Sequence, residues 1–173
     1  MLITRLAKIV MCLALAAFCL LVTFDNIIDY SANYAFVQHV MSMDTVFPDN
    51  TLRYRDITSP TLWHLAYALI IVAEGVTGAL FLLGALQMAK VLRAAGAEFN
   101  SAKGFAVAGA LAAFLVWFFG FLVVGGEWFD MWQSKVWNGQ EAAFRFYVTA
   151  LAVLIFVNQP DSDLPADPPD TET

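Results

Sequence analysis

The chain has 173 residues, of which 60% are hydrophobic and only 14% are charged. This balance lies outside the usual range of soluble domains and indicates a membrane protein with a single domain. The formal net charge is −6, but five of the fifteen acids fall in the C-terminal segment NQPDSDLPADPPDTET, so the remainder is close to neutral. No basic patch is present, and we therefore expect no binding to nucleic acid.

The first apolar run covers residues 6–24 and is long enough for a helix that crosses a bilayer, which needs about 20 apolar residues. Arg5 and Lys8 accompany it, an arrangement that also occurs in cleaved secretory signals. The run continues through AAFCLLVTF without an obvious cleavage site, which favours a retained helix. Cys12 and Cys19 would lie about 10 Å apart on this helix, beyond disulfide reach, so we expect both to be small core residues.

The connection over residues 25–61 is too long for a slack loop in so compact a chain. Within it, AFVQHVMSM places Phe36, Val37, Val40 and Met41 on one helical face and polar residues on another. This pattern predicts a short amphipathic helix at the membrane interface.

The second apolar run, residues 62–88, follows Pro60, which suits the first turn of a helix, and contains Glu74 near its middle. A carboxylate at mid-membrane costs free energy and should face other helices or water. At about 100° per residue, His64, Tyr67 and Glu74 share one stripe, a polar seam from the outer surface to the helix centre. The seam indicates either a protonatable group at the end of a polar path or a hydrogen-bonded carboxylate that fixes helix packing.

Two further apolar runs, residues 105–124 and 142–157, bring the number of predicted helices to four. None of the runs shows β-barrel alternation, so the predicted fold is all-α, a four-helix transmembrane bundle over residues 1–158. The fourth run is short, but it can span if Arg145 reaches the headgroups, and Glu141 is placed to pair with Arg145. Residues 159–173, rich in Pro and Asp, are predicted to form a disordered acidic tail.

Basic residues near the ends of the runs predict the orientation. Those at the N-terminus and in the second connection are Arg5, Lys8, Lys90, Arg93 and Lys103. Because such residues favour the cytoplasmic side, we expect both termini in the cytoplasm and the first and third connections outside.

The third connection belongs to GGEWFDMWQSKVWNGQEAAF, residues 125–144, which holds three of the five tryptophans. We expect Gly125 and Gly126 to end the third helix and Asn138 and Gly139 to turn the chain back. The three rings should anchor at the headgroup level as an aromatic belt; they are Trp128, Trp132 and Trp137.

Acidic residues and a histidine form a candidate site in this predicted outer cap: Asp25, Asp29, His39, Asp44, Glu127 and Asp130. Their spacing matches no known calcium or magnesium loop, so a solvated acidic surface is favoured over a cation site. His39 and His64 could ligate haem or a metal, but no cysteine or histidine motif accompanies them. We therefore expect no catalytic residue, metal or cofactor.

Three segments together resemble a known family: FDNIIDYSANYAFVQHVMSMDTVFPD, the helix around Glu74, and GGEWFDMWQSKVWNGQEAAF. The chain resembles the bacterial predicted small integral membrane proteins known as domain of unknown function 2165. The resemblance implies four helices in a bacterial inner membrane and gives no activity. Where the family would show paired histidines at the start of the second helix, this chain has Trp63 and His64. The family-like positions are Phe24, Asp25, Asn26, Asp29, Asn33, His39, Ser42, Met43, Asp44, Pro48, Glu74, Gly125, Gly126, Glu127, Trp128, Trp132, Ser134, Trp137, Asn138 and Gly139.

Three functions are compatible with the sequence. The favoured one is an accessory subunit of a larger membrane complex, or a homo-oligomer, that uses the Trp-rich outer cap. The second is a small carrier or channel for protons or ions that uses Glu74. The third is a redox or lipid-modifying membrane enzyme that uses His39, Asp44, His64 or Glu127. The lipid bilayer is the one partner common to all three.

Overall fold

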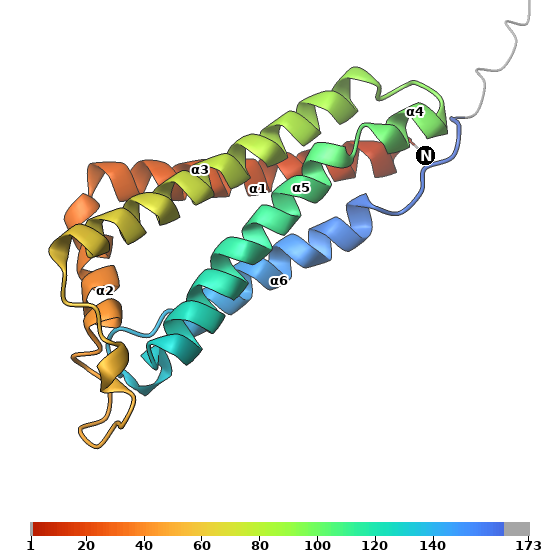
Figure 1. The fold of residues 1–173 in the computed structure, drawn as a ribbon. Coiled ribbons are helices and arrows are strands. Elements are labelled where there is room, and N and C mark those ends of the chain that lie inside the picture. The colour runs from red at the N-terminus through yellow and green to blue at the C-terminus, as the bar shows by residue number, and fades with distance from the viewer. Residues whose placement is uncertain (1, 165–173) are drawn as a thin grey trace, which may run out of the picture.

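Four helices are long and apolar enough to cross a membrane: Leu2–Ile28, Pro60–Lys90, Gly96–Trp128 and Gln140–Val157. The structure is a computed structural model that describes residues 2–164. These residues form helices and no strand (Figure 1). The prediction of an all-α integral membrane protein with four apolar helices is confirmed.

The helices extend beyond the apolar runs that predicted them, because polar residues continue each one. In chain order the elements are α1 (Leu2–Ile28), α2 (Tyr30–Ser42), η1 (Arg53–Arg55), α3 (Pro60–Lys90), α4 (Gly96–Ser101), α5 (Gly104–Phe114), η2 (Leu115–Trp128), η3 (Met131–Gln133) and α6 (Gln140–Val157). α3 begins with Ser59 as its N-cap and Pro60 in the first turn, as predicted. The predicted pair of Glu141 and Arg145 on α6 is also present.

The prediction that the third membrane helix ends at Gly125 and Gly126 is wrong. α5 continues directly into η2, a π-helix that runs through both glycines to Trp128. The wider π turn is visible in the hydrogen bond from Phe129 N to Val124 O (3.1 Å), which joins residues five apart. A Cβ atom on Gly125 would lie 3.3 Å from the Met131 side chain, so the absence of a side chain at Gly125 lets Met131 of η3 pack closely against η2.

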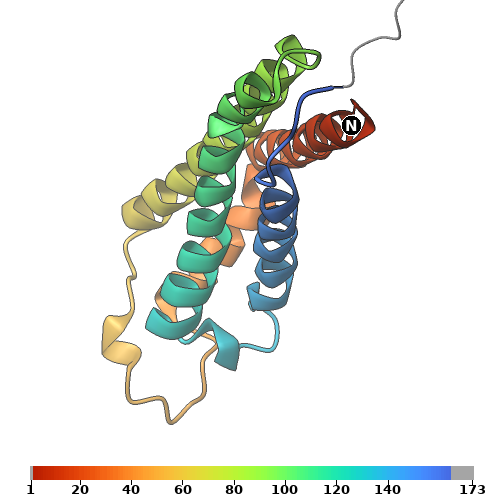
Figure 2. The same ribbon diagram turned by 90° about the vertical axis from the view of Figure 1, so that its right-hand side faces the viewer.

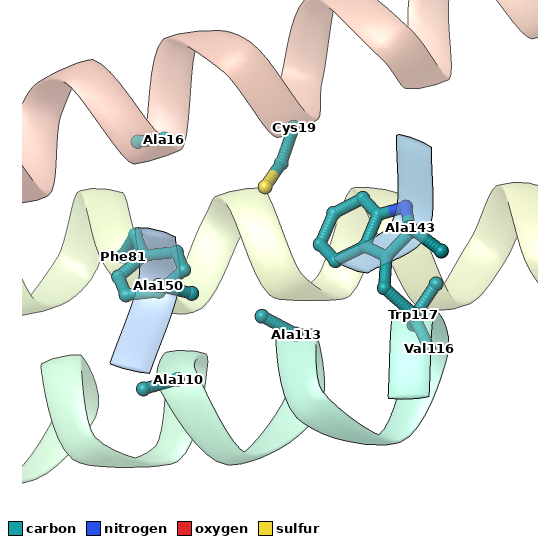
Figure 3. Close-up of a cluster of buried hydrophobic side chains, with 9 residues drawn as sticks. All are labelled: Ala16, Cys19, Phe81, Ala110, Ala113, Val116, Trp117, Ala143 and Ala150. Carbon is teal, nitrogen blue, oxygen red and sulfur yellow. The ribbon is translucent and has the colours of Figure 1, made fainter. Parts of the chain in front are cut away.

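The helices pack tightly at the end of the bundle where the N-terminus and the last described residues lie, which we call the terminal end. Side chains from α1, α3, α5 and α6 meet there and in the bundle centre, and Cys19, Ala110 and Ala113 point into the shared core (Figure 3). Gly84 lets the backbones of α3 and α5 approach, since a Cβ at this position would lie 2.6 Å from Ala106 N. Both cysteines are buried and free, as expected of core residues.

Toward the opposite end, α1 and α3 diverge from η2 and α6, and α2 lies across the widening space (Figure 1). α6 stays beside α5 and η2 along its length (Figure 2). We call residues 29–59 and 127–139, which close this end, the cap. Their two segments interlock: Asn50 Nδ2 donates to Asp130 Oδ2 (2.8 Å), and Thr45 Oγ1 donates to Ser134 Oγ (2.9 Å). Beneath these bonds, the side chains of Val40, Met43, Phe129 and Met131 form a small buried core.

The terminal end is held by a cluster of buried charges. Lys8 Nζ and Lys103 Nζ both donate to Asp161 Oδ2, at 2.5 and 2.6 Å. Arg5 donates to the carbonyl oxygens of Leu92, Ala94 and Ser162. Residues 159–164, which we expected to belong to a disordered tail, are therefore fixed against α1 and the start of α5. The rest of that expected tail, residues 165–173, lies outside the described residues.

Candidate functional site

Glu74 is buried, with 3% of its surface exposed, and hydrogen-bonds to a side chain from another helix. Asn26 Nδ2 on α1 donates to Glu74 Oε2 (2.7 Å), and Asn33 Nδ2 on α2 donates to Asn26 Oδ1 (2.6 Å). The backbone oxygen of Asn26 accepts from the Tyr67 hydroxyl (3.2 Å). One short polar chain thus joins α1, α2 and α3. Within residues 2–164, no Lys, Arg or His lies within 4 Å of the Glu74 carboxylate.

A cavity of about 220 Å³ lies beside this polar chain. Its lining comes from α1, α2, α3, η2 and α6 and consists of Val22, Asn26, Asn33, Phe36, Val37, Tyr67, Ile70, Glu74, Trp117, Phe121, Gly139, Ala142, Ala143 and Phe146. Asn33 and Ala142 are exposed, whereas Glu74, Tyr67 and Trp117 are buried. The exposed part of the lining therefore lies at the cap end, on α2 and in the first turn of α6, and Glu74 belongs to the buried part.

The predicted seam of His64, Tyr67 and Glu74 is only partly assembled around this cavity. Tyr67 and Glu74 line it, but His64 does not. The His64 ring instead stacks on Tyr34, with centroids 4.3 Å apart, and its Nδ1 lies 2.8 Å from the Tyr30 hydroxyl. The polar path from Glu74 consequently leads through Asn26 to α2 and not along α3 to His64.

The six residues of the candidate outer-cap site are not brought together as one group. His39 Nδ1 lies 2.7 Å from Asp44 Oδ2, and Asp130 is buried against Asn50. The remaining three carboxylates are exposed: Asp25, Asp29 and Glu127. Among residues 2–164, no group of three or more His, Cys, Asp or Glu side chains could hold a metal ion. Of the four residues considered for a membrane enzyme, His39 and Asp44 form a pair, whereas His64 pairs with Tyr30 and Glu127 is exposed elsewhere on the cap.

The three tryptophans expected to form a belt differ in their surroundings. Trp128 and Trp132 are 53% and 48% exposed, and the Arg55 guanidinium lies 4.8 Å from the centroid of the Trp128 ring. Trp137 stacks on His39, with centroids 4.5 Å apart. Its ring is therefore partly covered by the cap itself.

A second cavity, of about 490 Å³, lies between α2, α3 and η2. Its lining residues are nearly all apolar, and it shares Phe36, Val37, Ile70 and Phe121 with the Glu74 cavity. Both cavities thus occupy the space that opens where α1 and α3 diverge from η2 and α6.

Glu74 was predicted from the sequence as a candidate site residue, but its contact with Asn26 and the contact of Asn26 with Asn33 were not. Asn26 and Asn33 are seven residues apart, a spacing of about two turns if one helix continued through both. Because α1 ends at Ile28 and α2 begins at Tyr30, this spacing did not predict their contact. No comparable signal connects either residue with Glu74.

Comparison with known proteins assigns the chain to a family without giving an activity. The profile of the family described as "Predicted small integral membrane protein (DUF2165)" matches residues 4–160. No curated protein and no solved structure matches the chain.

Proposed function

The chain belongs to this family of predicted small integral membrane proteins, and we propose that it takes up a small cation or a proton at Glu74, as a carrier does. One observation carries the proposal: the Glu74 carboxylate is buried, has a neutral amide as its partner, and lines a cavity of about 220 Å³. A buried carboxylate costs several kcal/mol unless a positive charge or a proton compensates it. No cationic side chain among the described residues does so, which leaves this role to a ligand from outside the chain.

The proposed orientation places the cap outside a bacterial inner membrane and both termini in the cytoplasm. The beginning of α1, the end of α3 and the beginning of α5 lie together at the terminal end (Figure 1). The basic residues at or beside these helix ends are Arg5, Lys8, Lys90, Arg93 and Lys103. Basic residues near helix ends favour the cytoplasmic side. In this orientation the Glu74 cavity opens toward the outside.

The tight packing beyond Glu74 favours a carrier over an open channel. On the terminal side of the cavity, Phe81 and Ala110 are buried and Gly84 lies against Ala106. A ligand at Glu74 therefore has an open route toward the cap and a closed route toward the terminal end. Release on the closed side requires α3 to separate from α5, which is the behaviour expected of alternating access.

Transport by reconstituted protein tests the proposal. Proteoliposomes that contain the wild-type chain should show proton or sodium flux, measured with internal indicators of pH and of sodium, and Glu74→Gln should abolish it. Glu127→Gln is the matched control, because it removes the same charge from an exposed position on the cap. Equal flux in wild type and Glu74→Gln, with both proteins folded by circular dichroism, would rule out this role for Glu74.

An accessory role in a larger complex, or in a homo-oligomer, is the second candidate. It is favoured by exposed apolar side chains on an ordered cap, among them Tyr54, Trp128, Trp132 and Val136. Large aromatic residues commonly anchor protein interfaces. Purification in mild detergent should then recover a partner in fixed proportion, and Trp132→Ala should release it while Glu74→Gln retains it. Recovery of the monomer alone would contradict this candidate.

A further inference from the structure

We infer that the ligand of the Glu74 cavity is a small organic ammonium ion, held by the Glu74 carboxylate and by the faces of surrounding aromatic rings. This inference rests on the proposed function and adds the chemical class of the ligand. Aromatic side chains make up a large part of the cavity wall; they are Phe36, Tyr67, Trp117, Phe121 and Phe146.

The wall suits an organic cation because the face of an aromatic ring carries partial negative charge and attracts ammonium groups. Phe36 and Phe121 stack with centroids 6.0 Å apart, and Trp117 and Phe146 meet edge to face at 5.7 Å. These two pairs come from α2, η2 and α6. They line a cavity whose interior carboxylate is on α3, so the aromatic side chains and the charge are supplied by different helices.

The Glu74 carboxylate has an oxygen available for a ligand. Oε2 accepts from Asn26, whereas Oε1 accepts no hydrogen bond from residues 2–164 and is not sealed from solvent. An ammonium group near Oε1 would gain a charge-assisted hydrogen bond or a direct ion pair. The amide of Asn26 holds the carboxylate in place for this contact.

A hard metal ion fits the same cavity poorly. Calcium and magnesium take about six or more oxygen ligands. Among the side chains that line this cavity, Asn26 Oδ1 already accepts from Asn33 Nδ2, and the Tyr67 hydroxyl donates its proton to the Asn26 backbone oxygen. Three lining side-chain oxygens accept no hydrogen bond from residues 2–164: Glu74 Oε1, Asn33 Oδ1 and the Tyr67 hydroxyl oxygen. These are fewer than a calcium or magnesium ion requires, whereas one carboxylate oxygen and several aromatic rings suit an organic ammonium ion.

Asp25 and Asp29 also favour a cation at the opening. Asp25 precedes Asn26 directly and Asp29 follows it by three residues; both are exposed at the cap end of α1, outside the cavity lining. The two carboxylates add negative potential where a positively charged ligand would enter.

Isothermal titration of the purified full-length chain in lipid nanodiscs tests the inference. The probes are tetramethylammonium, choline, the neutral alcohol in which carbon replaces the choline nitrogen, and sodium ion. We expect both ammonium ions to bind and the neutral alcohol and sodium to bind at least about tenfold more weakly, since charge and ring contacts are both required. This comparison uses the wild-type chain, so it does not depend on the folding of any variant.

Variants then assign the contacts. Phe121→Leu and Phe146→Leu should each weaken choline binding by about 2- to 30-fold, the range expected for one cation–π contact. Phe118→Leu is the matched control, because Phe118 stacks on Phe114 outside the cavity lining, and it should leave binding unchanged. Glu74→Gln should reduce binding of both ammonium ions by more than tenfold.

The outcomes separate this inference from the proposed function. Equal binding of choline and its neutral analogue, or no binding of either, would overturn the inference. If Glu74→Gln still abolishes proton or sodium flux in that case, the proposed function stands. If flux and binding are both unchanged in Glu74→Gln, the proposed function fails as well.

Discussion

Asn26 supplies the side-chain hydrogen bond that the buried Glu74 carboxylate accepts inside the bundle. Its amide donates to the carboxylate and accepts from Asn33, so one side chain satisfies polar groups from two other helices. Glu74 was predictable from the sequence because an acid stands out within an apolar run. Its partner was not, because Asn26 is 48 residues away and hydropathy carries no information about which helices face each other.

The pairing of Asn26 with Glu74 predicts a coupled loss of stability. Asn26→Ala should destabilise the folded chain by about 1–3 kcal/mol, because it leaves a buried acceptor without a donor. In a Glu74→Ala background the same change should cost less, since the acceptor is absent. Unfolding in mixed micelles, followed by circular dichroism for both single variants and the double variant, measures the coupling free energy. Additive effects would show that the hydrogen bond contributes no net stability.

At the scale of the helices, hydropathy predicted the number of spans and their approximate centres but not all of their ends. The third helix passes through Gly125 and Gly126 because the π-helical turns of η2 continue there and Met131 packs against the first glycine. A glycine pair followed by polar residues is a common signal for a helix end, and in this chain close packing overrides it. The cavities were also not predictable, because they depend on how α3 diverges from η2, and this arrangement of helices is not encoded in local hydropathy.

The close approach of α3 and α5 gives a prediction about Gly84. Gly84→Ala should destabilise the bundle by about 1–3 kcal/mol, because the added methyl group meets the backbone of Ala106, which cannot move aside as a side chain could. Gly104→Ala is the matched control, since nothing lies within 4 Å of a Cβ at that position. The two variants are compared by their thermal unfolding midpoints in detergent. A midpoint for Gly84→Ala equal to that of the control would mean that the helices separate at no cost.

At the scale of the whole molecule, two polar assemblies hold the ends of an otherwise apolar bundle. The cap joins the first and third connections, and the Asp161 cluster joins α1, the start of α5 and the segment after α6. Composition predicted disorder for that last segment because Pro and Asp rarely support a packed core. Its first residues are fixed instead by hydrogen bonds from Arg5, Lys8 and Lys103, which no sequence pattern connects with this segment.

Asp161 should make the stability of the whole bundle sensitive to acid. Burial alone would raise the pKa of Asp161, but hydrogen bonds and charge from Lys103 and Lys8 outweigh burial and hold the pKa below its usual value. Because the folded-state pKa is the lower one, the stabilisation is fully present above the unfolded-state pKa of about 3.9 and is lost as the pH falls through the folded-state pKa. Asp161→Asn should cost about 3–5 kcal/mol at neutral pH, since it leaves two buried cations without their carboxylate.

The acid sensitivity is measured as the difference in unfolding free energy between wild type and Asp161→Asn across a pH series. This difference should be constant from neutral pH down to about 4 and should shrink below it, because protonation of the wild-type carboxyl removes the same charge that the substitution removes. Asp163→Asn is the matched control: Asp163 accepts a hydrogen bond from Gly96 N, which an asparagine oxygen can also accept. A difference that stays unchanged into strong acid would show that the ion pairs at Asp161 do not stabilise the terminal end.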